Sequence, residues 1–479
     1  MSLKQKTVYG ILWTFADAFL VKGLSFVSML LLARWLGPND FGLIGMLALF
    51  IGIGTSLVES GLPASLIRTK KTDNIDFSTV FYMNMAMSLV VYTLLFFIAP
   101  YIADFYGQQI LVNIIRVYCI SFIISAFSTV QLTILQKEMK FKKITLLNVP
   151  STILGVLVGL CLGYNDYGVW SIVAMYLTTQ VILSFLLWST TNWRPSFTFS
   201  IEKLQYHYKF GYKLMLSGLL NIVFNNSYHV LIGKYFPLQT LGYYERAQRF
   251  NEYPSITITG IVEKVTYPMM AKLQDDKQKL SVIYRKMLRL AFFITAPLML
   301  GVAAMAQPIF EIVLGEEWLP AVPYFQILSI AYMFYPIHAF NINVLKVFGR
   351  SDLFLKLEII KKIIIVVGIV VGFQFGILGL VWSGVLTSFL ALLVNTYYSS
   401  QLIDYSTKKQ LLDMVPILVL AVSACLLMYC VVDGFNNYQN GVQILSATFL
   451  GTLFYLSIHS LIKKSPMYDL LAIIKDRNI

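Results

Sequence analysis

Long apolar segments separated by short polar ones recur along the whole chain. Each is close to the roughly 20 residues that an α-helix needs to cross the hydrocarbon core of a bilayer. The pattern predicts an all-α integral membrane protein with about fourteen transmembrane helices, at residues 8–33, 42–66, 78–102, 110–135, 144–164, 168–189, 210–235, 245–271, 288–310, 321–346, 358–375, 377–398, 414–432 and 441–462.

Composition supports a multi-pass protein over a soluble domain with an anchor. The 479 residues are 57% hydrophobic and 13% charged, with a mean hydropathy of +0.70, whereas soluble domains are about half apolar and roughly a quarter charged. The run after the basic start "MSLKQK" is too long for a signal peptide and contains Asp17 and Lys22, so we expect a retained first helix. The four cysteines fall inside apolar runs without metal-site spacing, which favours packing roles.

The net charge of +13 is a topology signal. An even number of spans places both termini and every second loop on one side of the membrane. The segments on that side hold 30 of the 37 Lys and Arg. They are "MSLKQK", 68–71, 136–143, 190–213, 272–289, 346–362, 406–409 and the tail. The opposite loops are short and acidic or neutral. The positive-inside rule therefore predicts that both termini are cytoplasmic, and no nucleic-acid partner is expected.

Two halves of the chain resemble each other. Phe141, Lys143 and the glycines 155, 159 and 163 match Phe354, Lys356 and the glycines 368, 372 and 376 at one offset, and "ARWLGPNDFG" resembles "GKYFPLQTLG". Six helices per copy imply parallel repeats about an axis along the membrane normal. We expect lobes at 1–195 and 196–405, followed by two additional helices and a cytoplasmic tail at 406–479. The glycines are interpreted as helix-packing positions.

The predicted helix at 245–271 carries six charged residues. Helical spacing places a polar stripe along it, made of Glu245, Arg249, Glu252, Thr259, Glu263 and Thr266. Arg249 is spaced to pair with both Glu245 and Glu252. Because charges in the hydrocarbon region are costly unless they face a partner or water, the stripe predicts the wall of a transport pathway. The alternative is that charges near either end of this helix lie only at the membrane interface.

Further polar residues interrupt the other apolar helices. They are Asp17 and Lys22 in the first helix, Glu59 in the second, Arg116 in the fourth, and Asn221, Asn225 and His229 at four-residue spacing in the seventh. Most belong to equivalent helices of the two copies, which predicts a central cavity with polar walls. Arg116 is equally compatible with lining this cavity or lying at the interface.

Three segments carry a family resemblance: "GILWTFADAFLVKGLSFVSMLLLARWLGPNDFGLIG", "GLPASLIR" and "YGVWS". They resemble polysaccharide exporters of the multidrug/oligosaccharidyl-lipid/polysaccharide (MOP) superfamily, in particular the Wzx-type flippases for lipopolysaccharide and capsule precursors. The resemblance implies a V-shaped pair of six-helix bundles in the bacterial inner membrane. It also implies alternating access, which moves an undecaprenyl-pyrophosphate-linked oligosaccharide from the cytoplasmic to the outer leaflet.

The resemblance also suggests roles for individual residues. A cationic cavity suits a pyrophosphate, and the candidates for substrate binding here are Arg249, Lys264, Lys22, Arg116, Asn225 and His229. The acids Asp17, Glu59, Glu252 and Glu263 depart from a purely cationic wall, and they either pair with the bases or carry coupling protons. Membrane lipids and the polysaccharide polymerase machinery are expected partners, and neither a cofactor nor a metal is expected.

Two alternative functions would have different sequence signatures. A membrane glycosyl polymerase or ligase would need a large outward loop with catalytic groups, and the predicted outward loops are short and lack a Ser/His/Asp, paired-carboxylate or metal cluster. An ion-coupled multidrug or cation antiporter of the same superfamily would favour less basic lobes and twelve helices. The basic residues and the two additional helices favour the polysaccharide branch.

Overall fold

The computed structural model describes the backbone of residues 3–462 and 465–475, and their side chains except at 3–12, 15, 18, 261–265, 268, 351 and 472–475. The described residues are helical and contain no strand. The chain forms two compact units, Met1–Gly242 and Tyr243–Ile479, and each is described by itself.

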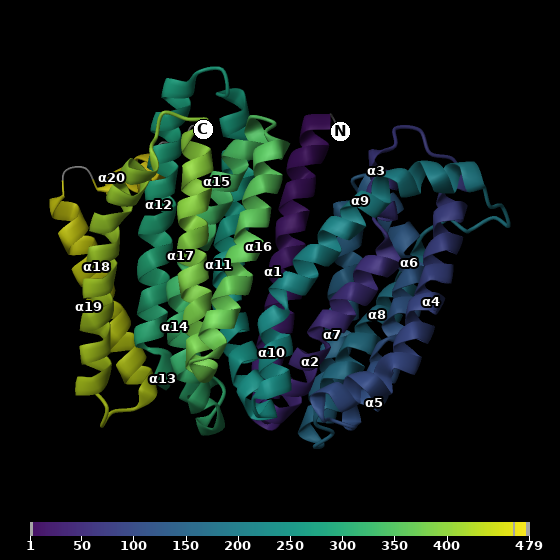
Figure 1. Cartoon of the computed structure of the whole chain (residues 1–479), viewed down its shortest axis with the longest axis horizontal. Coiled ribbons are helices and arrows are strands. Elements are labelled where there is room, and N and C mark those ends of the chain that lie inside the picture. The colour runs from purple at the N-terminus through teal and green to yellow at the C-terminus, as the bar shows by residue number, and fades with distance from the viewer. Residues whose placement is uncertain (1–2, 463–464, 476–479) are drawn as a thin grey trace. The chain divides into compact units, whose positions relative to one another are not determined.

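The first unit contains ten complete helices (Figure 1). They are α1 (Leu3–Trp35), α2 (Pro38–Glu59), α3 (Leu62–Arg68), α4 (Asn74–Tyr106), α5 (Ile110–Tyr118), α6 (Ile120–Lys137), α7 (Phe141–Tyr164), α8 (Val169–Thr190), α9 (Ile201–Asn225) and α10 (Ser227–Tyr235). Among them α7 packs along both α1 and α8, and α9 packs on α2, α3 and α4.

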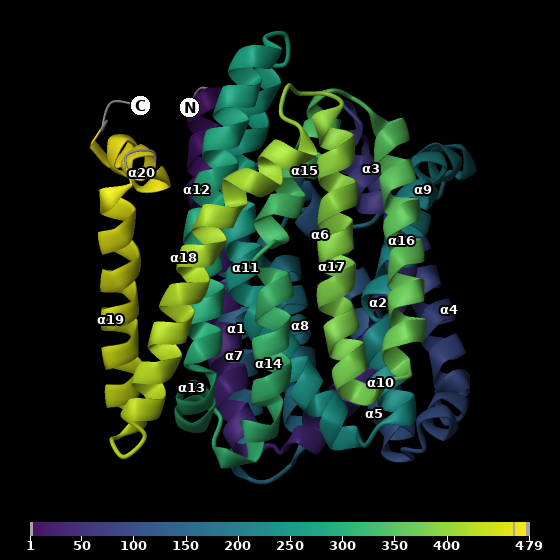
Figure 2. The ribbon, with the colours of Figure 1, turned by 60° about the vertical axis from the view of Figure 1, so that its left-hand side comes forward.

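The second unit begins inside α11 (Leu238–Lys272), which therefore belongs to both units. It continues with α12 (Lys277–Ala304), α13 (Ala306–Val313), the 3₁₀-helix η1 (Glu316–Ala321), α14 (Val322–Tyr332), α15 (Tyr335–Val347), α16 (Ser351–Phe373), α17 (Gly376–Ser400), α18 (Thr407–Gly434), α19 (Asn440–Leu461) and α20 (Pro466–Lys475). Figure 2 shows α16 and α17 side by side, and α18 packs between α12 and α19.

Ten helices or broken helices in the described part of the chain are long and apolar enough to cross a membrane, which confirms an all-α multi-pass membrane protein. The predicted segments 8–33, 210–235, 245–271 and 358–375 are helical but lie outside these ten. Charged residues exclude two of these segments from the apolar set. The segment 358–375 carries Glu358, Lys361 and Lys362 in its first turns, and the segment 245–271 carries the charged stripe. The total of fourteen spans and the arrangement of two six-helix bundles stay predictions.

Five of the predicted spans contain a break in the helix: 42–66, 110–135, 210–235, 288–310 and 321–346. Between α2 and α3, Ser60 and Gly61 have φ values of 47° and 68°, a left-handed conformation that ends a helix. The break between α9 and α10 falls at Asn226, directly after Asn225. Such breaks depend on single residues and leave the apolar pattern unchanged, which is why hydropathy does not reveal them.

The two matching segments pack in matching ways. A Cβ on Gly155 of α7 would collide with Thr179 of α8, and a Cβ on Gly368 of α16 would collide with Thr387 of α17. One turn further on, Gly159 meets Met175 and Gly372 meets Ser383 in the same helix pairs. These glycines therefore allow close helix approach, as expected. The third pair differs, because Gly163 packs on Leu32 of α1, whereas Gly376 begins α17 with a φ of +69°.

Aromatic side chains fill the core of the second unit. Phe292 of α12 stacks on Phe334 at 5.7 Å between ring centroids, and Tyr284 packs edge-on against Phe340 of α15. Since the surrounding lipid is as apolar as these side chains, such contacts stabilise the unit through close packing more than through the hydrophobic effect. The units divide after Gly242, so α9 and α10 pack with the first unit. The lobes at 1–195, 196–405 and 406–479 stay a prediction about the repeats.

Candidate functional site

Four charged side chains on consecutive turns of α11 form one network, which we call the α11 charge cluster: Glu245, Arg246, Arg249 and Glu252. Arg246 Nε donates to Glu245 Oε2 at 3.0 Å, and Arg249 Nε donates to Glu245 Oε1 at 3.1 Å. Arg249 Nη1 donates to Glu252 Oε2 at 3.2 Å. The pairing of Arg249 with both acids, expected from the three- and four-residue spacing, is confirmed.

The members of the α11 charge cluster differ in burial. Glu245 and Arg246 are only 5% and 6% exposed, whereas the Arg249 side chain is 59% exposed. A buried carboxylate needs partners, and each oxygen of Glu245 accepts from a different arginine. Arg249 is therefore held at its Nε by Glu245 and at its Nη1 by Glu252, while more than half of its side chain is exposed. A planar guanidinium presented in this way suits the oxygens of a phosphate.

The rest of the predicted stripe is mostly buried within the second unit. Thr259 donates to the carbonyl of Ser255 at 2.7 Å, and Thr266 is fully buried. On the same helix, Asn251 donates to the carbonyl of Phe325 and accepts from Ser329, both in α14. This part of α11 is therefore fixed against α14. The side chains of Glu263 and Lys264 lie outside the described residues.

The candidates in the first unit have mixed surroundings. Asp17 of α1 accepts from Asn148 Nδ2 of α7 at 3.0 Å, and Lys22 is exposed on α1. Arg116 of α5 lies 4.2 Å from the ring centroid of Phe96 in α4 and donates to its carbonyl. Glu59 is exposed at the last residue of α2. Arg116 is thus engaged in packing, while Lys22 is accessible.

The expected polar face of the seventh predicted helix is interrupted. Asn221 and Asn225 are exposed on α9, whereas His229 is buried on α10, beyond the break at Asn226. The three side chains therefore do not share one continuous exposed surface. Asn225 is the more accessible of the two that were expected to bind substrate.

A further polar cluster, which we call the α9 latch, was not predicted; it consists of Ser65, Asp76, Lys203 and His207. Ser65 Oγ lies 2.9 Å from His207 Nδ1, and His207 Nε2 lies 3.2 Å from Asp76 Oδ1. Lys203 Nζ lies 3.1 Å from the same carboxylate and 3.4 Å from Asp73. Its members come from α3, α4 and α9, so no local spacing in the sequence indicates the cluster.

The α9 latch has the residue types of a hydrolytic triad but not its accessibility. Ser65, Asp76 and His207 are each at most 2% exposed, so no substrate reaches the Ser65 hydroxyl. Its role is structural, since His207 and Gly211 are the buried residues of α9. Burial lowers the pKa of His207, which keeps the ring neutral. The hydrogen bond to Asp76 raises the pKa of Lys203.

A second lysine joins the same end of the first unit. Lys137 at the end of α6 donates to the carbonyls of Leu66 and Thr69 at 2.9 and 2.7 Å, and to the Thr72 hydroxyl at 2.7 Å. A cation here complements the free carbonyls at the C-terminus of α3. Three of the basic segments therefore meet at one end of this unit.

The helical fold is that of a multi-pass membrane protein. The sequence model of the family described as "Polysaccharide biosynthesis protein" matches residues 31–323, and the chain belongs to this family. This membership agrees with the resemblance to proteins of polysaccharide export.

Individual relatives are distant in sequence. The chain is 24% identical to the lipopolysaccharide biosynthesis protein WzxC of Escherichia coli K12, over 78% of this chain and 76% of that one. It is 25% identical to the teichuronic acid biosynthesis protein TuaB of Bacillus subtilis 168, over 74% and 73%. A solved structure of the lipid II flippase MurJ, in an inward closed conformation, has the same fold, with a TM-score of 0.76, 16% identity, and coverage of 94% of this chain and 98% of that one.

The α9 latch predicts a pH-dependent stability. Because the pKa of His207 is lowered by burial below its ordinary 6.5, the unfolded chain takes up the proton first as the pH falls below about 6.5. Stability gained from the neutral ring is therefore complete above that pH and is lost below it. We expect the melting temperature of the purified protein to fall between pH 7.5 and 5.5, and His207→Gln to reduce this fall by a few degrees.

The matched control is Lys209→Gln, which removes an exposed charge two residues further along α9. It should keep the pH dependence of the wild type. An unchanged pH dependence in His207→Gln would show that the ring does not govern the docking of α9.

Proposed function

We propose that this protein is a flippase that moves a polyprenyl-pyrophosphate-linked oligosaccharide from the cytoplasmic to the outer leaflet of the bacterial inner membrane. Transport proceeds by alternating access of a site that contains Arg249. The observation that carries the proposal is the exposed side chain of Arg249 on α11, which the buried Glu245 holds at its Nε. Family membership and the names of the two relatives, which concern lipopolysaccharide and teichuronic acid, support glycan cargo.

The other candidate residues have subsidiary roles in this proposal. Arg249 and Lys22 are both exposed, and each is a proposed contact for the pyrophosphate, with Lys264 as a further candidate. Glu252 neutralises Arg249 while cargo is absent. Asn225 offers an accessible amide to the glycan. Arg116 and His229 are weaker candidates for substrate binding, because Arg116 packs on Phe96 and His229 is buried. Asp17, Glu59 and Glu263 stay candidates for proton coupling, and the polymerase machinery stays an expected partner.

The distribution of basic residues supports the proposed orientation of the protein in the membrane. In the second unit, Arg285 pairs with Asp413 and Ser281 donates to the carbonyl of Asp404, so α12 and α18 begin at the same end. That end carries the basic segments 272–289 and 406–409. In the first unit, the α9 latch and Lys137 likewise bring basic segments to one end. The positive-inside rule makes these ends, and both termini, cytoplasmic.

Arg249 provides the sharpest test of the function. In a strain lacking the chromosomal gene, we expect surface polysaccharide to be lost and lipid-linked oligosaccharide to accumulate, and the wild-type gene to reverse both. Arg249→Ala should not reverse them, although its membrane abundance should stay near that of the wild type, because Glu245 keeps Arg246 as a partner. Arg249→Lys should restore export in part, since it keeps the charge but loses the planar donor fork.

Arg246→Ala is the matched control on the same network. It removes the buried partner of the buried Glu245, and breaking a buried ion pair costs about 3–5 kcal/mol. Its abundance and export should fall together. Full export by a normally abundant Arg249→Ala protein would contradict a substrate-contacting role for Arg249.

The orientation has its own test. Single cysteines are placed near Lys277, Lys408 and Glu316 after the exposed Cys161 and Cys430 have been replaced. A membrane-impermeant maleimide added to intact cells should label the position near Glu316 and should reach the other two only after the membrane is opened. Labelling near Lys277 from outside would reverse both the orientation and the proposed direction of transport.

A further inference from the structure

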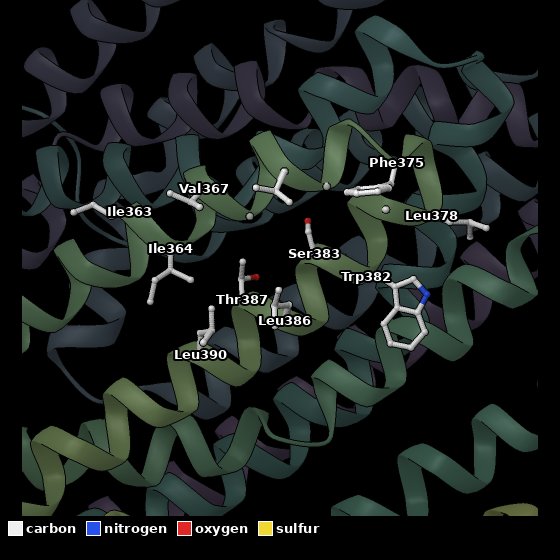
Figure 3. A pocket seen from close by; sticks show the side chains of 14 residues that line it. Ile363, Ile364, Val367, Phe375, Leu378, Trp382, Ser383, Leu386, Thr387 and Leu390 are labelled. Carbon is white, nitrogen blue, oxygen red and sulfur yellow. The ribbon is translucent and has the colours of Figure 1, made fainter.

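An apolar groove of about 740 Å³ runs between α16 and α17 in the second unit (Figure 3). Its wall on α16 extends from Ile363 to Gly372, Phe375 lies in the turn before α17, and its wall on α17 extends from Leu378 to Leu390. Twelve residues of helix correspond to roughly 18 Å. The groove is therefore long and is formed by one helix pair alone.

Residue size explains the shape of the groove. Its floor consists of small residues, because a Cβ on Gly372 would lie 2.7 Å from the carbonyl oxygen of Gly379 and from Ser383 Cβ. Its rims consist of large side chains that are about half exposed, among them Val367, Trp382 and Leu386. The close approach of the two backbones, between large side chains on either side, forms a groove that is open along one side.

The lining offers a ligand almost no polar group. Its two hydroxyls both donate to their own helix, Ser383 Oγ to the carbonyl of Leu380 at 2.7 Å and Thr387 Oγ1 to that of Gly384 at 3.1 Å. The remaining lining residues are aliphatic, aromatic or glycine. An occupant of this groove must therefore be an elongated hydrocarbon.

A cation lies at one end of the groove. Lys356 precedes Ile363 by two helical turns and so lies on the same face of α16. It is exposed, and its Nζ lies 6.0 Å above the ring of Tyr398 on α17, so it sits between the same two helices. The neighbouring Lys361 is paired with Glu358 at 2.5 Å. The groove and its end thus match an amphiphile with an apolar chain and an anionic head.

We propose that this groove binds the polyprenyl chain of the lipid-linked cargo, with Lys356 as the first counter-charge for its pyrophosphate during loading. The inference rests on the proposed function and deepens it. Sixteen residues separate Lys356 from Gly372 on α16, or roughly 24 Å of helix, which is most of the ~30 Å hydrocarbon core. An acyl chain confined to one leaflet would fill about half of this path, whereas a polyprenyl chain is long enough to follow all of it.

Two neighbouring valines on α16 allow a matched test. Val371 lines the groove and is 53% exposed, whereas Val370 is 59% exposed and lies outside it. The probe is a polyprenyl diphosphate with a photoreactive diazirine on its distal isoprene unit, added to the full-length protein in phosphatidylcholine nanodiscs. We expect labelling of α16 and α17, reduced about tenfold by Val371→Trp and little changed by Val370→Trp.

Val367→Trp, in the groove, and Val366→Trp, outside it, repeat the test if either first variant fails to fold. Lys356→Gln should lower labelling by the diphosphate about two- to fivefold and leave labelling by an uncharged polyprenol unchanged, while Lys409→Gln should affect neither. Equal labelling of both valine variants, or complete competition by excess phosphatidylglycerol, would overturn the proposal.

Failure of this proposal is distinguishable from failure of the proposed function. If the groove is empty of polyprenyl chain but the function is correct, the gene deletion still blocks surface polysaccharide. If the function is wrong, the deletion leaves surface polysaccharide intact whatever the labelling shows.

Discussion

A charged side chain within the hydrocarbon region costs several kcal/mol unless a partner or water compensates it. This constraint determines how the polar residues of the apolar helices are arranged. Glu245 is buried with one arginine on each carboxylate oxygen, and Asp17 accepts from Asn148 of a neighbouring helix. Arg116 lies against the face of an aromatic ring. Arg249 differs from these residues because its side chain stays 59% exposed after its pairing, which is why we propose it as the contact for an anionic cargo.

Two kinds of contact hold the helices of each unit together. Glycines at matching positions bring α7 to α8 and α16 to α17, and polar latches such as Ser65, His207 and Asp76 fix helices that bury little apolar surface. Both kinds of contact join neighbouring helices of one unit.

Much of the fold could be predicted because apolar length is a strong local signal. The predicted spans coincide with helical residues, and the spacing of Glu245, Arg249 and Glu252 correctly gave their pairing. The breaks at Ser60 and Asn226 could not be predicted, because they depend on backbone angles at single residues. The α9 latch also escaped prediction, since Ser65 and His207 are 142 residues apart. Arg246 is buried whereas Arg249 is exposed. This difference depends on the neighbouring helices, so helical spacing alone does not indicate it.

The central claim is that this chain carries a lipid-linked glycan across the bilayer. The most direct measurement places the purified protein in liposomes with a fluorescent oligosaccharide on a polyprenyl diphosphate and follows quenching by an impermeant reductant. We expect the protected inner-leaflet pool to become accessible in vesicles that contain the wild-type protein, and to stay protected with Arg249→Ala. Equal protection in vesicles with and without the wild-type protein, under conditions in which it is folded and correctly inserted, would contradict the account.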